Sequence, residues 1–257
     1  MAKSSKLGLW SLPIEANTKQ AEWVLDTGMT FSTVTESEAK RVGLTLLDSG
    51  GRGSSGHTAR ELPIRLAIAT DLRIGSAHLR NVVFAVVADN ALNFGSDRLR
   101  GIIGLPAIRA LGSIAVSARG MVRIHSDSTK PRSEPNMFFD GLTPIVEAIH
   151  AGRAVPMTLD TGGTTTYLYS SFREILTPEE RAKLSRQNRR FGGVGGSIKI
   201  ETELLPKLEL ELPGRTVGLI GVALRSDTNP FSDGLLGIDA LKGGFAIDFN
   251  TMRLELD

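Results

Sequence analysis

Two copies of one short motif carry the residues of this chain that are best suited to chemistry. Asp26-Thr27-Gly28 recurs 134 positions later as Asp160-Thr161-Gly162. From average residue usage, Asp-Thr-Gly is expected by chance only about 0.05 times in a chain of this length. Two carboxylates held roughly 3 Å apart share one proton, because ionising both is costly, so one serves as base and the other as acid. The repeat therefore predicts paired carboxylates that perform general acid–base chemistry.

A second landmark repeats with nearly the same spacing. The segment Gly101–Leu105, with sequence GIIGL, recurs 133 positions later as GLLGI at Gly234–Ile238. Two independent landmarks with one offset indicate an internal duplication of the whole chain. If the two halves pack about an approximate two-fold axis, Asp26 and Asp160 meet across it.

Each residue of the motif has a role in this chemistry. The basic carboxylate removes a proton from a water held between the pair, and that water attacks a peptide carbonyl; the acidic partner hydrogen-bonds the carbonyl oxygen, and a proton passes to the leaving amine. Gly28 and Gly162 permit close approach of the backbones. The hydroxyls of Thr27 and Thr161 can bond across the junction of the halves and fix the carboxylate spacing. This route requires neither a metal nor a cofactor.

Composition limits the other possibilities. The chain has 257 residues, 41% of them hydrophobic, and a net charge of +2, which is typical of a folded protein without a strongly basic surface. It has no cysteine, which excludes disulfides, thiol catalysis and cysteine metal sites. The longest apolar run, 82–88, has seven residues where a membrane helix needs about 20. We expect a soluble protein, cytoplasmic as written, or periplasmic or secreted if a signal peptide is missing.

The elements that must position the motifs are mostly strands. Glycine is frequent, at 28 residues, and alternating or continuous apolar runs predict strands at 62–68, 82–88, 198–201, 208–212 and 217–224. Helices are predicted to be few and short, at 36–42, 106–111, 170–175, 178–187 and 238–242. A polar segment with two prolines at 126–136 predicts a linker between an N-terminal lobe, 1–125, and a C-terminal lobe, 137–257.

These features resemble the aspartic proteases, and the bacterial retropepsin-like branch more closely than the pepsins. In each half an apolar strand enters Asp-Thr-Gly, a Gly-rich segment follows, and an apolar-apolar-Gly strand precedes a short helix. The resemblance implies an all-β, bilobal pepsin-like fold of two closed β-barrel-like lobes with a cleft between them. It implies an aspartic endopeptidase with Asp26 and Asp160 as catalytic residues, acting on peptides as a monomer. It also makes 245–249 and 253–256 a terminal hairpin.

The sequence departs from the pepsins directly after the motif. Pepsins carry Ser or Thr there, and its hydroxyl bonds the carboxylate, whereas this chain has Met29 and Gly163. Losing a hydrogen bond to the ionised form favours protonation, so we expect a mildly acidic to neutral pH optimum.

Gly-rich segments in both halves are candidate flaps that contact substrate. Such tips between strands suit a mobile lid, and having one in each half resembles the two-flap retroviral arrangement. Neither contains the tyrosine of a pepsin flap. The candidate residues are Gly53, Ser54, Ser55, Gly56, His57, Gly193, Val194 and Gly195.

Other motifs and residue clusters in the sequence give weaker support for a function. The segment 51–56 matches the dinucleotide pattern G-x-G-x-x-G literally, but no strand–helix context surrounds it. The four histidines are scattered, so no metal site is expected. Arg186, Arg189 and Arg190 are interpreted as solvated, and nucleic-acid binding is not expected.

The main alternative is a catalytically silent retropepsin fold that serves as a peptide-binding or dimerisation module. Changing either motif aspartate to asparagine distinguishes the two.

Overall fold

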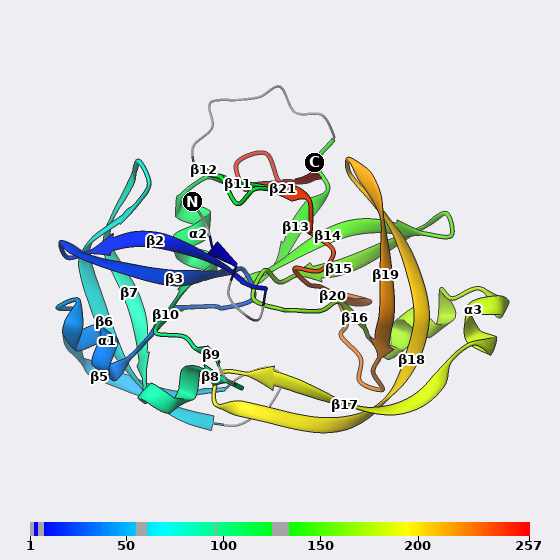
Figure 1. Cartoon of the computed structure of the whole chain (residues 1–257), viewed down its shortest axis with the longest axis horizontal. Coiled ribbons are helices and arrows are strands. Elements are labelled where there is room, and N and C mark those ends of the chain that lie inside the picture. Colours follow the sequence, from blue (N-terminus) through cyan, green and yellow to red (C-terminus); the bar gives the residue numbers. More distant parts are fainter. Residues whose placement is uncertain (1–2, 5–7, 55–60, 96, 125–133) are drawn as a thin grey trace. The chain divides into compact units, whose positions relative to one another are not determined.

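The computed structural model describes residues 3–4, 8–54, 61–95, 97–124 and 134–257 (Figure 1). The chain forms two compact units. The first comprises Met1–Leu111 together with Arg190–Lys199, and the second comprises Gly112–Arg189 together with Ile200–Asp257. Strands dominate both units and the helices are short, which confirms the predicted all-β fold class.

The first unit is built on an eight-stranded sheet. Its hydrogen-bonded order is β1-β2-β3-β10-β4-β7-β6-β5, and a further pairing of β2 with β6 closes six of these strands into a barrel. The strands are β1 (Lys3–Ser4), β2 (Trp10–Ala16), β3 (Lys19–Asp26), β4 (Ser32–Thr35), β5 (Thr45–Ser54), β6 (Glu61–Ile74), β7 (Ala77–Val87) and β10 (Gly101–Gly104). Also here are α1 (Glu36–Arg41), η1 (Asp89–Leu92), β8 (Asn93–Phe94), β9 (Asp97–Arg98) and α2 (Leu105–Ala110).

The second half of the chain repeats this topology strand for strand. Its order is β13-β14-β15-β20-β16-β19-β18-β17, and β14 pairs with β18 as β2 pairs with β6. The strands are β13 (Met137–Asp140), β14 (Thr143–His150), β15 (Arg153–Leu159), β16 (Tyr167–Leu168), β17 (Ser185–Gly193), β18 (Gly196–Leu212), β19 (Arg215–Leu224) and β20 (Gly234–Leu236). The helices are η2 (Ser170–Glu174) and α3 (Pro178–Ala182). Equal strand order in both halves is what an internal duplication produces.

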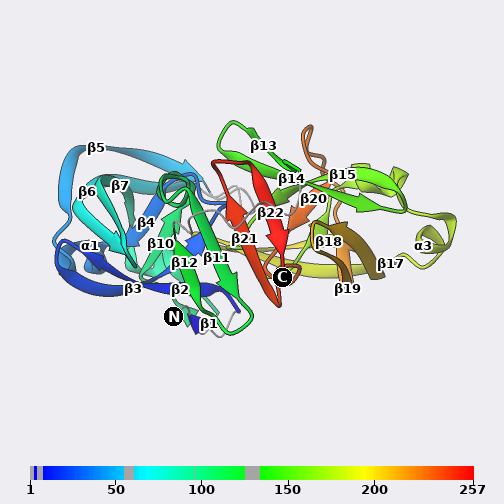
Figure 2. The ribbon, with the colours of Figure 1, turned by 90° about the horizontal axis from the view of Figure 1, so that it is seen from above.

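A smaller sheet of four strands completes the second unit. Figure 2 shows β11 (Ser113–Ser117), β12 (Val122–Ile124), β21 (Gly244–Asp248) and β22 (Arg253–Leu256) side by side, in the order β12-β11-β21-β22. The predicted terminal hairpin is therefore present as β21 and β22. β11 pairs with β21 of this hairpin and β12 pairs with β11, so both strands belong to the second compact unit. Of the predicted linker, residues 126–133 lie outside the described residues.

Trp23 anchors the strand that leads to the first motif. Its ring is fully buried, lies edge-on to Phe84 with centroids 5.3 Å apart, and donates from Nε1 to the Glu38 carboxylate at 3.0 Å. Arg41 pairs with the same carboxylate from the last turn of α1. Gly101 faces the ring: a Cβ there would lie 2.5 Å from Trp23 Cδ1. A glycine at this place in β10 is therefore what lets β10 lie beside β3.

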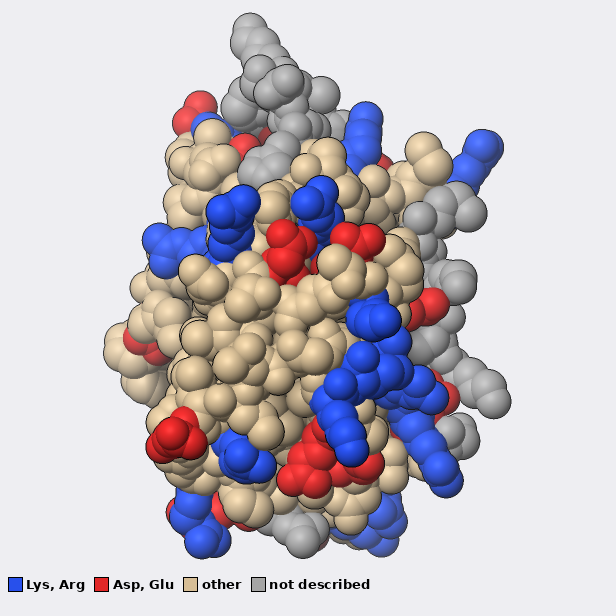
Figure 3. Space-filling model, turned by 90° about the vertical axis from the view of Figure 1, so that its left-hand side faces the viewer, with Lys and Arg blue, Asp and Glu red and all other residues tan. Residues whose placement is uncertain are grey.

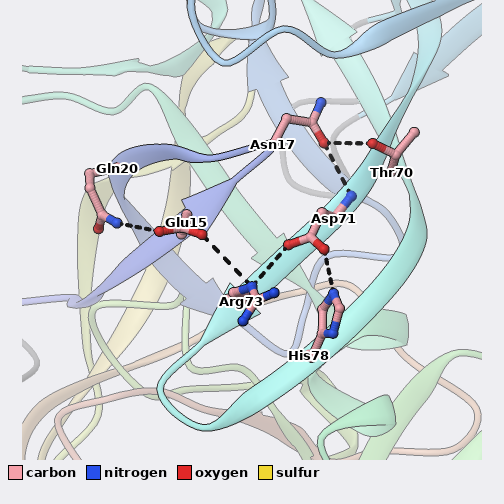
Figure 4. Close-up of polar contacts among 7 residues, drawn as sticks. All are labelled: Glu15, Asn17, Gln20, Thr70, Asp71, Arg73 and His78. Carbon is pink, nitrogen blue, oxygen red and sulfur yellow. Dashed lines mark hydrogen bonds and ion pairs between the residues drawn. The ribbon is translucent and has the colours of Figure 1, made fainter.

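The turn between β2 and β3 is fixed to β6 by Asn17. Its backbone has a φ of 45°, a left-handed conformation that asparagine tolerates better than most residues. Its Oδ1 accepts hydrogen bonds from the Thr70 hydroxyl at 3.0 Å and from the Asp71 backbone N–H at 3.1 Å (Figure 4). Nearby, Asp71 pairs with Arg73 and His78. These contacts stabilise the β2–β6 pairing that closes the first barrel.

Two of the predicted helices differ from the structure. The helix predicted at 178–187 ends at Ala182, because from Ser185 onward the chain pairs with β18 as β17, so strand pairing overrides the local helical signal. The segment predicted as a helix at 238–242 is a turn. It makes only three-residue hydrogen bonds, such as Leu241 N–H to Ile238 O, and stops at Gly243, which has a φ of +100°. The helices predicted at 36–42, 106–111 and 170–175 are present as α1, α2 and η2.

Charges are mixed on the surface. On the side of the molecule where α1 and β5 lie, acidic and basic side chains surround a broad uncharged area, with basic groups gathered toward one edge (Figure 3). This pattern agrees with the small net charge of +2. Within the described part of the chain, no helix is long and apolar enough to cross a membrane.

Candidate active site

The first motif lies at the end of a buried strand. Asp26 is the last residue of β3, and β10 runs parallel to β3 with Gly104 opposite Asp26. Asp26 is half-buried, and its Oδ1 accepts the Gly28 backbone N–H at 2.8 Å. Thr27 is buried, with an exposed fraction of 1%. The loop thus presents one carboxylate at the mouth of the first barrel, with its orientation set by backbone.

The second motif has the same local geometry. Asp160 directly follows β15, which runs parallel to β20, and its backbone N–H bonds the Leu236 carbonyl at 3.1 Å. Its Oδ1 accepts the backbone N–H groups of Gly162 and Gly163, both at 2.9 Å. Asp160 and Thr161 are buried. Backbone donors therefore fix the orientation of this carboxylate.

A hydroxyl–glycine bond ties each motif loop to its neighbouring strand. Ser32 Oγ accepts the Gly104 backbone N–H at 3.1 Å, and Thr166 Oγ1 accepts the Gly237 backbone N–H at the same distance. Sequence reasoning missed these residues. The signal was available, because each hydroxyl residue follows its aspartate by six positions, in line with the duplication.

The glycines of these bonds admit no side chain. A Cβ at Gly104 would lie 2.5 Å from the Phe31 carbonyl carbon, and one at Gly237 would lie 2.7 Å from the Thr165 carbonyl carbon. Real Cβ atoms do not come that close to backbone. The final glycine of each apolar-apolar-Gly segment is therefore needed for the motif loop to pass across its strand.

The two loops differ at the position after the motif. Met29 packs its side chain against an apolar cluster of the first unit, whereas Gly163 uses its N–H on Asp160. Neither supplies the hydroxyl found in pepsins. A Cβ at Gly163 would lie 3.2 Å from Asp160 Oδ2 and 3.0 Å from Leu235 Cδ2, so a small side chain there requires only a slight movement of Leu235.

Asp239 gives the second loop an additional support. Its carboxylate accepts both the backbone N–H of Thr166, at 2.9 Å, and the Thr166 hydroxyl, at 2.8 Å. The corresponding place in the first half holds Pro106, which has no acceptor side chain. Asp239 lies in the turn that sequence reasoning assigned to a helix.

An aromatic and cationic cluster lies near Asp160. The Tyr167 ring packs edge-on to Tyr169, and the Arg225 guanidinium lies 5.0 Å from the Tyr167 ring centroid. Burial, and secondarily the neighbouring Tyr169, raises the pKa of Tyr167 far above its usual range; the charge of Asp160 adds to this effect. Arg225 is held by two bonds to Asp227, at 2.7 and 2.8 Å. Tyr167 therefore stays neutral at every physiological pH.

The candidate flap residues fall into two groups. Gly53 and Ser54 are the last residues of β5, while Ser55, Gly56 and His57 lie outside the described residues. In the second half, Gly193 ends β17, and Val194 and Gly195 form the tip before β18. These residues connect β17 to β18 and belong to the first compact unit.

A hollow of about 360 Å³ opens on the second unit, away from the motif loop itself. Charged side chains of both signs line it, and Arg173 pairs with Glu203 across it. The lining residues are Ser170, Arg173, Arg186, Glu201, Thr202, Glu203, Leu224, Arg225 and Ser226. Among the residues that the structure describes, no cluster of acidic, histidine or cysteine side chains could hold a metal ion.

Solved structures of other proteins have a similar fold. Conglutin gamma, a basic 7S globulin from lupine seeds, aligns with a TM-score of 0.60 at 12% identity, over 98% of this chain and 92% of its own. Basic 7S globulin from soybean aligns with a TM-score of 0.57 at 11% identity, over the same shares. A retropepsin-like aspartic protease from Rickettsia conorii aligns with a TM-score of 0.32 at 16% identity, over 42% of this chain and 76% of its own. The chain therefore has the pepsin-like double-barrel fold.

One family model matches part of the first half of the chain. Residues 12–107 match the family described as aspartyl protease. This stretch runs from β2 to α2 and includes Asp26, Ser32 and Gly104. The resemblance to the aspartic proteases, expected from the repeated motif, is thus supported by sequence over this stretch. No curated protein sequence matches the chain.

Proposed function

We propose that this protein is an aspartic endopeptidase in which Asp26 and Asp160, one from each half, activate a single water. The observation that supports this most is the equivalence of the two loops. Each half presents one carboxylate beside a parallel strand pair, held through Oδ1 by the backbone N–H two residues on, at 2.8 Å for Gly28 and 2.9 Å for Gly162.

The proposed mechanism uses only residues of the two loops. One carboxylate, ionised, takes a proton from the water, and the resulting hydroxide forms a bond to the peptide carbonyl carbon. The other carboxyl, protonated, donates a hydrogen bond to the carbonyl oxygen as that oxygen gains charge. The C–N bond then breaks, and the leaving amine takes a proton from the carboxyl pair. Thr27 and Thr161, both buried, are proposed to fix the spacing of the carboxylates.

The direct test is digestion of casein by purified protein and its single variants. Asp26→Asn and Asp160→Asn should each abolish cleavage and leave the fold intact, as judged by circular dichroism and thermal unfolding. Asp48→Asn is a matched control, because Asp48 lies on β5 outside both motif loops. Cleavage that survives both motif variants at the unaltered rate would refute the proposal.

A second candidate is a non-catalytic module that binds peptides or dimerises. It is favoured by one observation: two solved structures that align with nearly the whole chain are named as basic 7S globulins. Such a module would hydrolyse nothing, and changes in the two loops would weaken binding of its partner instead. The same casein assay, together with the mass in solution by light scattering, separates the two candidates; the protease is expected as a monomer.

A further inference from the structure

A buried histidine, His150, links α3 to the barrel of the second half. It is the last residue of β14, and only 4% of its surface is exposed. Its ring packs against Phe172 of η2 with the ring centroids 5.3 Å apart. Nδ1 lies 2.8 Å from the backbone carbonyl oxygen of Glu209 in β18, and Nε2 lies 3.1 Å from Oε2 of Glu180 in α3. One imidazole ring therefore joins β14, β18 and α3.

Both polar partners of this ring are hydrogen-bond acceptors. The backbone carbonyl of Glu209 can only accept. Oε2 of Glu180 also accepts the Thr177 backbone N–H at 2.9 Å, as part of the capping box of α3. Burial opposes ionisation of Glu180, but the hydrogen bonds from Thr177 and His150 outweigh burial and lower the pKa of this carboxyl below its ordinary value of 4.5. Glu180 is therefore an anion at neutral pH.

The His150 ring satisfies both acceptors only when each of its nitrogens carries a proton. A neutral imidazole has one N–H and one lone pair. If Nδ1 donates to the carbonyl, the lone pair of Nε2 faces the Glu180 carboxylate; if Nε2 donates, the lone pair of Nδ1 faces the carbonyl oxygen. Each neutral form thus brings two lone pairs together, whereas the imidazolium makes two charge-assisted hydrogen bonds.

The other charged side chains on the elements around His150 are exposed, so water and salt screen them. Arg153 lies opposite His150 on β15, and its guanidinium donates to the Glu174 carbonyl. Arg181 of α3 donates to the same carbonyl. Glu180 is thus the charged side chain that contacts the ring. The exposed set on β14, β15, η2, α3 and the adjoining part of β18 is Glu147, Arg153, Arg173, Glu174, Glu179, Arg181, Lys207, Glu209 and Glu211.

We propose that His150 and Glu180 form a pH-sensitive latch, in which the protonated ring holds α3 against β14 and β18 and loss of its proton releases this helix. Histidine in an unfolded chain loses its proton at about pH 6.5. Because the docked state needs the proton, the latch is closed below that pH and opens as the pH rises far enough to deprotonate the docked ring. α3 has only five residues, too few to stay helical without packing, so its release opens the segment locally.

The latch has an acidic limit as well. It needs the Glu180 anion, whose pKa in the folded state lies below 4.5. The contribution of this anion is present above pH 4.5 and is lost as the pH falls through the folded-state value. Docking of α3 is therefore strongest in a window that extends from mildly acidic to neutral pH.

The ring ¹⁵N chemical shifts of the full chain, labelled at histidine, test the protonation of His150. The signals are assigned by their loss in His150→Gln. At about pH 7 both nitrogens should have the shift of a protonated nitrogen, and Glu180→Gln should return one of them to the shift of a nitrogen with a lone pair. Glu179→Gln, at an exposed position of the same helix, is the matched control and should leave both protonated. A lone-pair nitrogen on His150 in the unaltered protein at this pH overturns the proposal.

Limited digestion with trypsin tests the release of α3, because cleavage after Arg181 or Lys183 requires the segment to open. Cleavage rates are taken relative to a free peptide of the same sequence at the same pH. In the unaltered protein and in Glu179→Gln, the relative rate should rise about ten-fold between about pH 7 and pH 9, the scale of one charge-assisted hydrogen bond. Glu180→Gln should be cut at the faster relative rate at both pH values. Equal relative rates at the two pH values in the unaltered protein, or a rise that persists in Glu180→Gln, overturn the latch.

Discussion

The hydroxyl of Ser32 accepts the backbone N–H of Gly104 at 3.1 Å, and this bond joins the loop after Asp26 to the strand beside it. The second half repeats the bond between Thr166 and Gly237. Both pairs are buried, so each hydroxyl satisfies a backbone donor that has no access to water.

Removing these hydroxyls should destabilise the protein. Ser32→Ala leaves a buried N–H without its acceptor, which costs about 1–3 kcal/mol. Thr166→Val should cost more, because Thr166 also donates to Asp239. Urea unfolding measures both changes. Thr216→Val, at an exposed position of β19, is the control and should lie within about 0.5 kcal/mol of the unaltered protein. Equal stability of Ser32→Ala and this control would contradict the argument.

Adding a methyl group at the glycine of such a pair should destabilise the protein more than removing the hydroxyl does. Gly104→Ala places a Cβ against the backbone of Phe31, which cannot move as a side chain can. We expect a loss of at least about 1–3 kcal/mol, with loss of activity through displacement of the loop. Gly51→Ala is a suitable control, since a Cβ there meets nothing within 4 Å. The midpoints of thermal unfolding of the two variants are compared. Similar midpoints would show that the strand at Gly104 tolerates a side chain against the backbone of Phe31.

Stability should fall at acidic pH partly through Glu38. Burial opposes ionisation of this side chain, but its hydrogen bonds with Arg41 and Trp23 outweigh burial and lower the pKa of Glu38 below its ordinary value of 4.5. A lowered pKa in the folded state stabilises the fold above pH 4.5, and that contribution is lost as the pH falls through the folded-state value. Glu38→Gln should therefore cost about 1.5–3 kcal/mol at pH 7 and progressively less below pH 4.5.

Urea unfolding followed by tryptophan fluorescence between pH 3 and pH 7 measures this dependence. Glu36→Gln, two residues earlier at an exposed position of α1, is the control and should show no such pH dependence. A Glu38→Gln penalty that stays constant across the whole range would exclude ionisation as its source.

The pH profile of catalysis should respond to a hydroxyl placed after the second motif. Gly163→Ser puts an oxygen next to Asp160, and a hydrogen bond to the ionised carboxylate favours that form. The acidic limb of the kcat profile should move to lower pH. Gly163→Ala, which adds the carbon without the hydroxyl, separates this effect from crowding against Leu235. A serine variant whose acidic limb coincides with that of the alanine variant would refute the explanation.

Much of this architecture could be predicted from local sequence. The offset between Asp26 and Asp160 predicts two equivalent halves, and apolar patterning predicts strands within β6, β7, β18 and β19, because both signals lie within short stretches. The capping box at Thr177 likewise predicts the start of α3.

What could not be predicted depends on contacts between distant segments. Local sequence predicts a helix after Gly237, whereas the structure has a turn whose Asp239 carboxylate accepts a hydrogen bond from Thr166, 73 residues earlier. The segment after Ala182 has helical composition but pairs with β18. The packing of Val194 on the apolar cluster of the first unit, more than 90 residues earlier in the chain, has no local signal, since a Gly-rich tip looks the same whether docked or free.

A crystal structure of the unaltered protein at mildly acidic pH tests the central claim most directly, because it measures the separation of the Asp26 and Asp160 carboxylates. Nearest oxygens about 3 Å apart, with one water bonded to both, are the expected result. Carboxylates that point away from each other, or lie too far apart to bond a common water, would contradict the shared-water mechanism.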